Sequence, residues 1–195
     1  MRVSPPFIRT PRLVLRLAGR EDVPAILEYL TANRDHLTPF EPAWPADMLC
    51  ESLWISRVTF FRQEFERGTL VRLFLFDLQD PRRVVGGVGL SQIVHAPWHA
   101  CFLGYALDAT FEGRGYMREA LKAILPWAFG ELGLHRVMAN YMPHNVRSAR
   151  LLRSLGFVVE GYARDYLRIN NRWEDHVLTS LINCDWQAPS ASEVR

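Results

Sequence analysis

Three strand-like runs follow one another in the middle of the chain, and the pattern then changes at a glycine-rich turn. The runs cover residues 70–78, 83–94 and 99–108. Turn residues at Asp80-Pro81 and Ala96-Pro97 separate them, which predicts an antiparallel meander. Beyond the turn, apolar residues recur at helical spacing, so we expect a helix over residues 113–132 that begins at glycines.

Further strands and helices are expected on both sides of this segment. Residues 7–17 predict a strand because apolar and polar side chains alternate from Leu13, and helices are expected over residues 21–33 and 47–67. Beyond the glycine turn we expect, in order, a strand, a helix and two strands over residues 135–142, 145–155, 158–169 and 173–183. This order predicts an α/β (α+β) fold, with helices packed on a mixed, mostly antiparallel sheet.

Length and composition limit the class of protein. A chain of 195 residues suits one domain, which we expect over residues 1–186, with a flexible tail over residues 187–195. The net charge of +2 gives no reason to expect direct DNA binding or a membrane partner. Three cysteines without a C-x-x-C pair favour a reducing, cytoplasmic setting. We find no signal peptide and no run of the roughly 20 apolar residues that a membrane span needs.

The segment Glu112-Gly113-Arg114-Gly115-Tyr116-Met117 carries the strongest chemical signal. The first N–H groups of a helix have no partner within it, and the helix dipole adds partial positive charge there. Glycine lets an anion approach the backbone and Arg114 adds a cation, so the turn suits a pyrophosphate. A plain tight turn is the alternative, because a lone Gly-x-Gly is common. Neither a P-loop nor a dinucleotide-binding fingerprint is present.

A second segment follows the glycine turn, and the two together resemble the GNAT superfamily of N-acetyltransferases. The second segment consists of His135-Arg136-Val137, Asn140, Asn145-x-x-Ser148, Leu151-Leu152 and Leu155-Gly156-Phe157. Residues 138–157, the ending 160–181 and the loop 37–45 are similar to those of bacterial RimJ-type ribosomal-protein-alanine N-acetyltransferases, and the likeness runs from about Arg12 to Trp186. Two positions depart from the superfamily pattern. Glu112 stands where Gln or Arg is usual, and Met117 where Gly or Ala is usual.

The resemblance implies a GNAT fold with acetyl-CoA as cosubstrate. No metal is expected, because His95 and His99 have no third ligand near them in sequence. In that fold helices cover both faces of the sheet, which splays between its fourth and fifth strands, here 99–108 and 135–142, and the thioester lies in the gap. The backbone of the fourth strand pairs with the pantetheine arm like an added strand. The implied cofactor-binding residues are Tyr105, Ala106, Leu107, Gly113, Arg114, Gly115, Tyr116, Met117 and Asn145. Glu112 is not expected to bind, because a carboxylate repels phosphate.

Acetyl transfer to an amine needs a neutral amine, a donor that polarises the thioester carbonyl, and an acid for the leaving thiolate. Many relatives place a tyrosine as the acid where this chain has Leu152, so we predict Ser148 in its place. The alternative for Ser148 is a hydroxyl bonded to a backbone carbonyl of its own helix. The resemblance implies Asp165 as a base acting through water, because related enzymes carry a carboxylate at the matching place on this strand. The alternative is a strand-end acid salt-bridged to Arg164 or Arg168. The weaker candidates for the base are Glu119, Glu174 and His176.

The resemblance implies acetylation of the N-terminal alanine of a small-subunit ribosomal protein, with ribosome association a further expectation. The proline-rich loop 37–45 suits a lid over a peptide. Two alternatives to this acceptor stay open. A GNAT enzyme could act on a small amine such as an antibiotic, a polyamine or an amino acid, because the glycine turn indicates only which cofactor binds. A non-catalytic ribosome- or RNA-binding module would use the basic helix edge formed by Arg147, Arg150 and Arg153.

Overall fold

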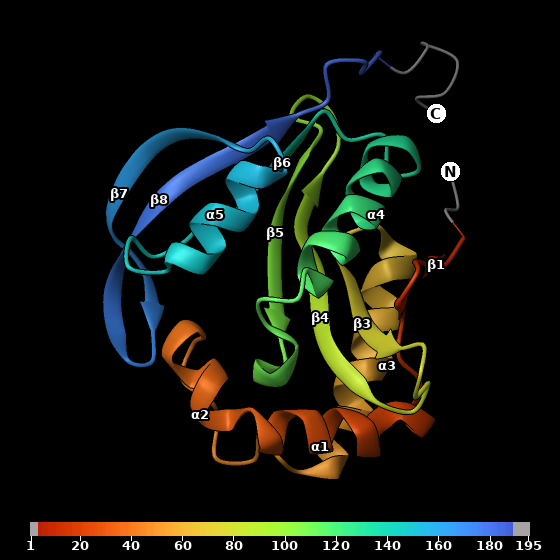
Figure 1. Ribbon diagram of the computed structural model, residues 1–195. Coiled ribbons are helices and arrows are strands. Elements are labelled where there is room, and N and C mark those ends of the chain that lie inside the picture. Colours follow the sequence, from red (N-terminus) through yellow and green to blue (C-terminus); the bar gives the residue numbers. More distant parts are fainter. Residues whose placement is uncertain (1–3, 189–195) are drawn as a thin grey trace.

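An eight-stranded sheet forms the centre of the protein in a computed structural model that describes residues 4–188 (Figure 1). The strands are β1 (Phe7–Arg9), β2 (Leu13–Arg16), β3 (Val71–Asp77), β4 (Val84–Val94), β5 (Ala100–Leu107), β6 (Arg136–Met138), β7 (Val158–Ile169) and β8 (Arg172–Ile182). Their order is β1-β2-β3-β4-β5-β6-β8-β7. All neighbours are antiparallel except β5 and β6, which are parallel. The prediction of a mixed, mostly antiparallel sheet is therefore confirmed.

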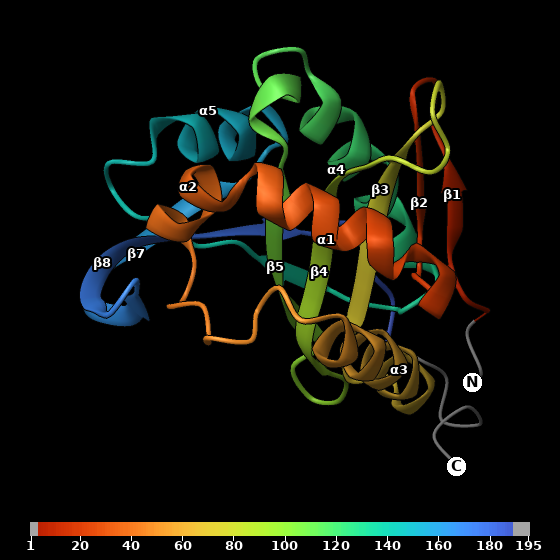
Figure 2. The same cartoon turned by 90° about the horizontal axis from the view of Figure 1, so that it is seen from below.

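Helices cover both faces of this sheet, as predicted. They are α1 (Val23–Ala32), α2 (Arg34–Leu37), α3 (Glu51–Arg67), α4 (Tyr116–Gly130) and α5 (Val146–Ser154). Figure 2 shows α4 and α5 on one side of the sheet and α3 on the other, with α1 crossing near the ends of the strands. The short helix α2 lies between α1 and the β7–β8 hairpin (Figure 1).

The central strand β3 joins two hydrophobic cores. Leu73 and Leu75 pack into the core that contains the apolar face of α4, whereas Phe74 and Phe76 pack into the core formed with α1 and α3. Successive side chains of a strand point to opposite faces, so an apolar run is what a strand buried on both faces requires.

Two expected elements differ from the structure. Residues 7–17 form two strands instead of one, because the Thr10-Pro11-Arg12 segment turns the chain and the N–H of Thr10 donates to the carbonyl of Leu13 at 2.9 Å. The helix expected from residue 47 begins at Glu51, after a turn. The turn expected at Asn170-Asn171 is present, and both residues have the positive φ that a two-residue hairpin turn demands, 41° and 67°.

Two further sequence expectations concern the C-terminal tail and membrane-spanning segments. The tail predicted over residues 187–195 falls mostly on residues 189–195, which lie outside the described residues. Within residues 4–188, no helix combines the length and the apolar character that crossing a membrane requires.

The sheet splays between β5 and β6. These strands pair only over Ala100–Phe102 and Arg136–Met138, whereas β4 stays paired with β5 as far as Leu107. The edge of β5 over residues 103–107 therefore faces a gap on the β6 side. This is the splay expected between the fourth and fifth strands, because residues 7–17 supply two strands and shift the count by one.

Candidate active site

A glycine-rich turn leads from β5 to α4 and leaves space above the start of the helix. Gly113 and Gly115 have φ values of 70° and 80°, which glycine adopts without strain, and Gly115 is the N-cap of α4. Among the described residues, a Cβ at Gly113 would meet no atom within 4 Å, and one at Gly115 would meet only Arg12, at 3.6 Å. The first N–H groups of α4 therefore border a space that an anion can enter.

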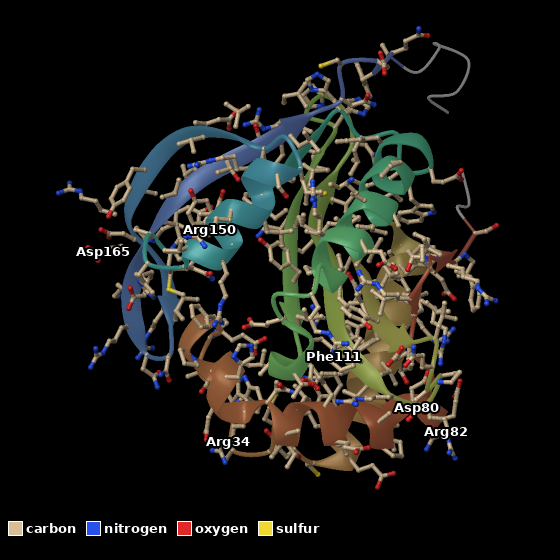
Figure 3. The ribbon with its side chains drawn as sticks, in the orientation of Figure 1. Arg34, Asp80, Arg82, Phe111, Arg150 and Asp165 are labelled. Atoms are coloured by element: carbon tan, nitrogen blue, oxygen red, sulfur yellow. The ribbon has the colours of Figure 1, made fainter. Side chains whose placement is uncertain are left out.

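The other residues predicted at this turn differ in what they can offer a phosphate. Tyr116 and Met117 are buried in the core under α4, so only their backbone N–H groups are available. Arg114 is exposed, and its guanidinium carbon lies 5.6 Å from the ring centre of Phe111, which Figure 3 labels. Arg114 thus has the exposure that a mobile cation beside a phosphate needs.

The carboxylate of Glu112 contacts an arginine and a histidine from other elements. Its Oε2 lies 2.5 Å from Nη1 of Arg147 on α5, and its Oε1 lies 3.3 Å from Nε2 of His36 on α2. A nearby guanidinium offsets the negative charge, so Glu112 can stand next to a turn that suits phosphate. These contacts support the expectation that Glu112 does not itself bind the pyrophosphate.

Glu119, a weaker candidate for the base, ties the β1–β2 turn to α4. Its carboxylate accepts hydrogen bonds from Oγ1 of Thr10 at 2.6 Å and from N and Nε of Arg12 at 2.9 and 2.6 Å. Desolvation acts to raise the pKa of Glu119, but the bonds from Thr10 and Arg12 outweigh it and hold the pKa below its ordinary value. A carboxylate held in this way favours a structural role.

Ser148 faces the unpaired part of β5 and contacts a tyrosine from that strand. Its Oγ lies 2.6 Å from Oη of Tyr105, so the pair spans the gap between α5 and β5. No backbone carbonyl among the described residues accepts from this hydroxyl. Burial raises the pKa of Tyr105 to about 12 although the bond to Ser148 acts in the opposite direction, so the phenol is protonated at neutral pH. Sequence reasoning selected Tyr105 only for its backbone and missed the phenol.

Asn145 and Leu152 frame Ser148 on the same helix. The side chain of Asn145 accepts from the backbone N–H of Ser148 at 3.1 Å and caps α5, so the capping role considered for Asn145 is present. Its role toward pantetheine stays a prediction. Leu152 is 1% exposed and belongs to the core with α4.

The structure does not bring Asp165 to the Tyr105–Ser148 pair. Asp165 is exposed on β7, the edge strand, and Figure 3 shows it on the outer side of that strand. Its φ is 47°, and the register of β7 with β8 shifts between Ala163 and Leu167. The N–H of Asp165 donates to Oδ1 of Asp175 at 2.8 Å. The role of Asp165 as a base stays a prediction, and this position gives it no direct support.

The two other candidates for the base lie on β8. His176 is 4% exposed, its Nδ1 lies 3.0 Å from the carbonyl oxygen of Glu174, and its ring packs on Tyr166 with ring centres 5.3 Å apart. This buried setting favours a structural histidine. The side chain of Glu174 is half-buried and has no hydrogen-bond or ion-pair partner within residues 4–188. Across that same range, no cluster of three or more His, Cys, Asp or Glu side chains could hold a metal ion.

The loop expected as a lid is joined to the β7–β8 hairpin and to the segment before α5. The N–H of Asn170 donates to the carbonyl of Glu41 at 3.0 Å, and the ring of Phe40 lies 6.3 Å from that of His144. Nε1 of Trp44 donates to Oε2 of Glu41 at 2.8 Å and braces the loop from within. Loop 37–45 therefore lies between α2 and the hairpin, next to the gap in the sheet.

Known proteins share both the sequence and the fold of this chain. The family described as Acetyltransferase (GNAT) domain matches residues 12–158. The ribosomal protein uS5-alanine N-acetyltransferase of Escherichia coli (strain K12) is 40% identical over 179 residues, which cover 92% of this chain and 92% of that protein.

Two solved structures have a similar fold. The crystal structure of ribosomal-protein-S5-alanine acetyltransferase from Vibrio fischeri has a TM-score of 0.89 and 36% identity, covering 94% of this chain and 100% of that chain. Mycobacterium smegmatis RimJ in complex with CoA-disulfide has a TM-score of 0.82 and 26% identity, covering 98% of this chain and 88% of that chain.

Proposed function

This chain belongs to the GNAT acetyltransferase family, and on that basis we propose that it acetylates the N-terminal alanine of a small-subunit ribosomal protein. The chain is an acetyl-CoA-dependent N-acetyltransferase. The choice of acceptor rests on one observation, the 40% identity to the uS5-alanine enzyme over 92% of both chains. A ribosomal acceptor also supports the proposals of a cytoplasmic setting and of ribosome association.

The geometry supports a cosubstrate that enters from the α4 and α5 side. The pyrophosphate lies above Gly113 and Gly115, at the N-terminus of α4. The pantetheine arm continues into the gap, where backbone groups of residues 105–107 have no partner on the β6 side. An N–H of this stretch polarises the thioester carbonyl as it becomes an oxyanion.

The amine attacks the thioester carbon directly. A C–N bond forms, the C–S bond breaks with its electron pair on sulfur, and the sulfur takes a proton. We assign this proton to Ser148, because its hydroxyl stands at the gap and Tyr105 can replenish it across the 2.6 Å contact. Because burial raises its pKa, Tyr105 is protonated at neutral pH and has a proton to supply to its partner.

The base must remove a proton from an amine whose pKa is about 8. Only a modest base is needed, so a carboxylate acting through water suffices. Asp165 is the sequence-derived proposal, and Glu174 is the alternative that the structure favours, because it is half-buried and its carboxylate has no other partner among residues 4–188.

The test is thiol release from acetyl-CoA with short peptides that begin with Ala or Ser. The proposal expects turnover of Ala-starting peptides, with acetylation of the α-amine shown by mass spectrometry. Release driven by polyamines, antibiotics or free amino acids, with no peptide turnover, supports the small-amine alternative. Binding of acetyl-CoA without any turnover supports the non-catalytic module.

A comparison of ribosomal proteins from cells with and without the gene identifies the acceptor. The proposal expects one small-subunit protein to lose the mass of an acetyl group at its N-terminal alanine. An unchanged set of N-termini would remove the ribosomal assignment and leave the GNAT chemistry intact.

A further inference from the structure

A cavity of about 350 Å³ lies on the face of the sheet opposite α4 and α5. α1 and α3 supply its walls, and its floor is formed by small residues of β4 and β5: Gly89, Ser91, Gly104 and Ala106. Glu41 of the loop 37–45 also lines it. The cavity therefore reaches from the two-helix core to the loop beside the gap.

A single arginine from the central strand lies along this floor. Arg72 belongs to β3, and its guanidinium lies against β4, where a Cβ at Gly87 would come within 3.1 Å of Nη2 and one at Gly89 within 3.4 Å of Nη1. Both glycines thus leave the space that the guanidinium fills. The small residues of the floor give the cation room to meet a ligand from above.

Arg72 lacks a partner among residues 4–188. It takes part in no ion pair or hydrogen bond there, and its guanidinium carbon lies 5.6 Å from the ring centre of Phe74. Burial lowers the pKa of Arg72, yet arginine stays protonated at neutral pH. Glu41 acts on Arg72 as a nearby negative charge but forms no ion pair with it within residues 4–188, so the guanidinium keeps donors for an anion.

A second polar group in the cavity also lacks a partner. Tyr29 on α1 is 6% exposed and lines the cavity, and its hydroxyl forms no hydrogen bond within the described residues. Burial raises the pKa of Tyr29 despite the opposing effect of Arg72, so the hydroxyl is a neutral donor. A guanidinium and a phenol are the donors that a carboxylate accepts from.

The cavity adjoins the reacting centre through β5. The side chain of Ala106 packs with the α1 and α3 core, whereas that of Tyr105 packs with the α4 core and reaches Ser148. The cavity and the proposed acid therefore lie on opposite faces of one strand segment. An acceptor that occupies the cavity can present its amine at the β5 edge from the side opposite the cosubstrate.

We infer that this cavity is an acceptor subsite that binds a carboxylate, with Arg72 as its ionic partner and Tyr29 as a second donor. Arg57, which also lines the cavity, adds positive charge, and its guanidinium carbon lies 5.1 Å from the ring centre of Trp54. Glu41 is the opposing charge, and it lies on the loop side, where it suits the amine end of an acceptor. The inference rests on the proposed function and specifies its acceptor as an Ala-starting peptide with an acidic side chain near its N-terminus.

The experiment compares pairs of Ala-starting peptides that differ only by Glu or Gln, at each of the positions that follow the alanine. Wild-type protein is expected to show kcat/KM higher by about tenfold to 100-fold for the Glu peptide at one position, the range of a hydrogen bond to a charged group. Arg72→Met is expected to abolish that preference, and Tyr29→Phe to reduce it. A free amino acid, which carries its own carboxylate, is assayed in parallel.

The matched control is Arg82→Met, which removes the same charge from the exposed β3–β4 turn; Arg82, labelled in Figure 3, does not line the cavity. It is expected to keep the full Glu preference. Tyr29→Phe removes a hydroxyl that has no hydrogen-bond partner within residues 4–188, so it keeps the test available if Arg72→Met does not fold.

The outcomes separate this inference from the proposed function. Turnover of Ala-starting peptides with equal use of Glu and Gln at every position overturns the subsite and leaves the proposed function standing. A Glu preference that survives in Arg72→Met also overturns it. Turnover of free amino acids but of no peptide, lost in Arg72→Met, supports a carboxylate subsite and contradicts the proposed acceptor.

Discussion

The hydroxyl oxygens of Tyr105 and Ser148 lie 2.6 Å apart, one on β5 and the other on α5, at the gap where the sheet opens. We expect Ser148→Ala to lower kcat by roughly 100-fold or more, because proton transfer by a positioned group contributes about 10²–10⁴-fold. The KM for acetyl-CoA should change little, since the lost interaction is made in the transition state. Steady-state kinetics decide this, and a normal kcat with a large rise in KM would assign Ser148 to cosubstrate positioning.

The Tyr105→Phe variant tests whether Ser148 receives its proton from Tyr105 or acts as the acid without it. If Tyr105 replenishes Ser148, the double variant should be no slower than Ser148→Ala, because the phenol acts only through the serine. Additive losses would instead indicate two independent contributions. Melting temperatures of all three variants show whether packing has changed.

Gly115 is expected to be necessary for stabilisation by coenzyme A. A ligand at about 100 times its Kd raises the free energy of unfolding by roughly 2.7 kcal/mol, which a thermal melt detects. Gly115→Leu should abolish that shift, because a side chain would enter the space above the turn. Gly133→Leu is the control, since Gly133 also has positive φ, at 62°, with no described atom within 4 Å of a Cβ. Loss of the shift in both variants would point to backbone strain.

The two carboxylates proposed as the base can be distinguished by pH. For the true base, the amide variant, Asp165→Asn or Glu174→Gln, should lower kcat/KM by about 10²–10⁴-fold near neutral pH. The deficit should shrink above the amine pKa of about 8, where the acceptor is already neutral. The measurement is kcat/KM against pH for wild type and both variants. A profile parallel to that of wild type removes the variant's residue from the mechanism.

Glu119 should stabilise the fold above its unfolded pKa. Its pKa is held low in the folded state, so its contribution is present above roughly pH 4.3 and disappears as pH falls through the folded value. Glu119→Gln should cost about 1–3 kcal/mol at pH 7 and flatten the acid limb of the stability curve. Denaturant unfolding from pH 2 to pH 7 measures this. Glu66→Gln, on the exposed side of α3, should behave as wild type.

The sequence predicts most of the elements because their signals are local. Strand alternation, helix spacing and turn residues such as Asn170-Asn171 give most boundaries to within a few residues. The glycine turn is also visible, since Gly113 and Gly115 occur where a strand pattern becomes a helix pattern. The hairpin at Thr10-Pro11 was missed because three residues make too short a strand for periodicity to register.

The site is harder to predict because side-chain direction depends on contacts between distant segments. The phenol of Tyr105 contacts Ser148, which lies 43 residues away in sequence, and hydrophobic periodicity cannot predict such a contact. The shift in register after Ala163 alters which face of the sheet the following β7 side chains occupy, so strand alternation cannot place Asp165. One signal was available: Arg72 is a lone cation in the apolar run Leu70–Leu75, and such a residue calls for a partner or a ligand.

The splay between β5 and β6 has a consequence for local opening of the sheet. The two halves of the sheet, β1–β5 and β6–β8, meet in a seam of three residue pairs. A short seam opens more readily than the long β3–β4 and β4–β5 ladders beside it, so amide protons near residues 100–102 should exchange sooner than those of β4. Under the proposed function, a cosubstrate that hydrogen-bonds to the free edge of β5 would extend this seam. We therefore expect bound acetyl-CoA to slow this exchange, so that the protein is most rigid with its cosubstrate in place.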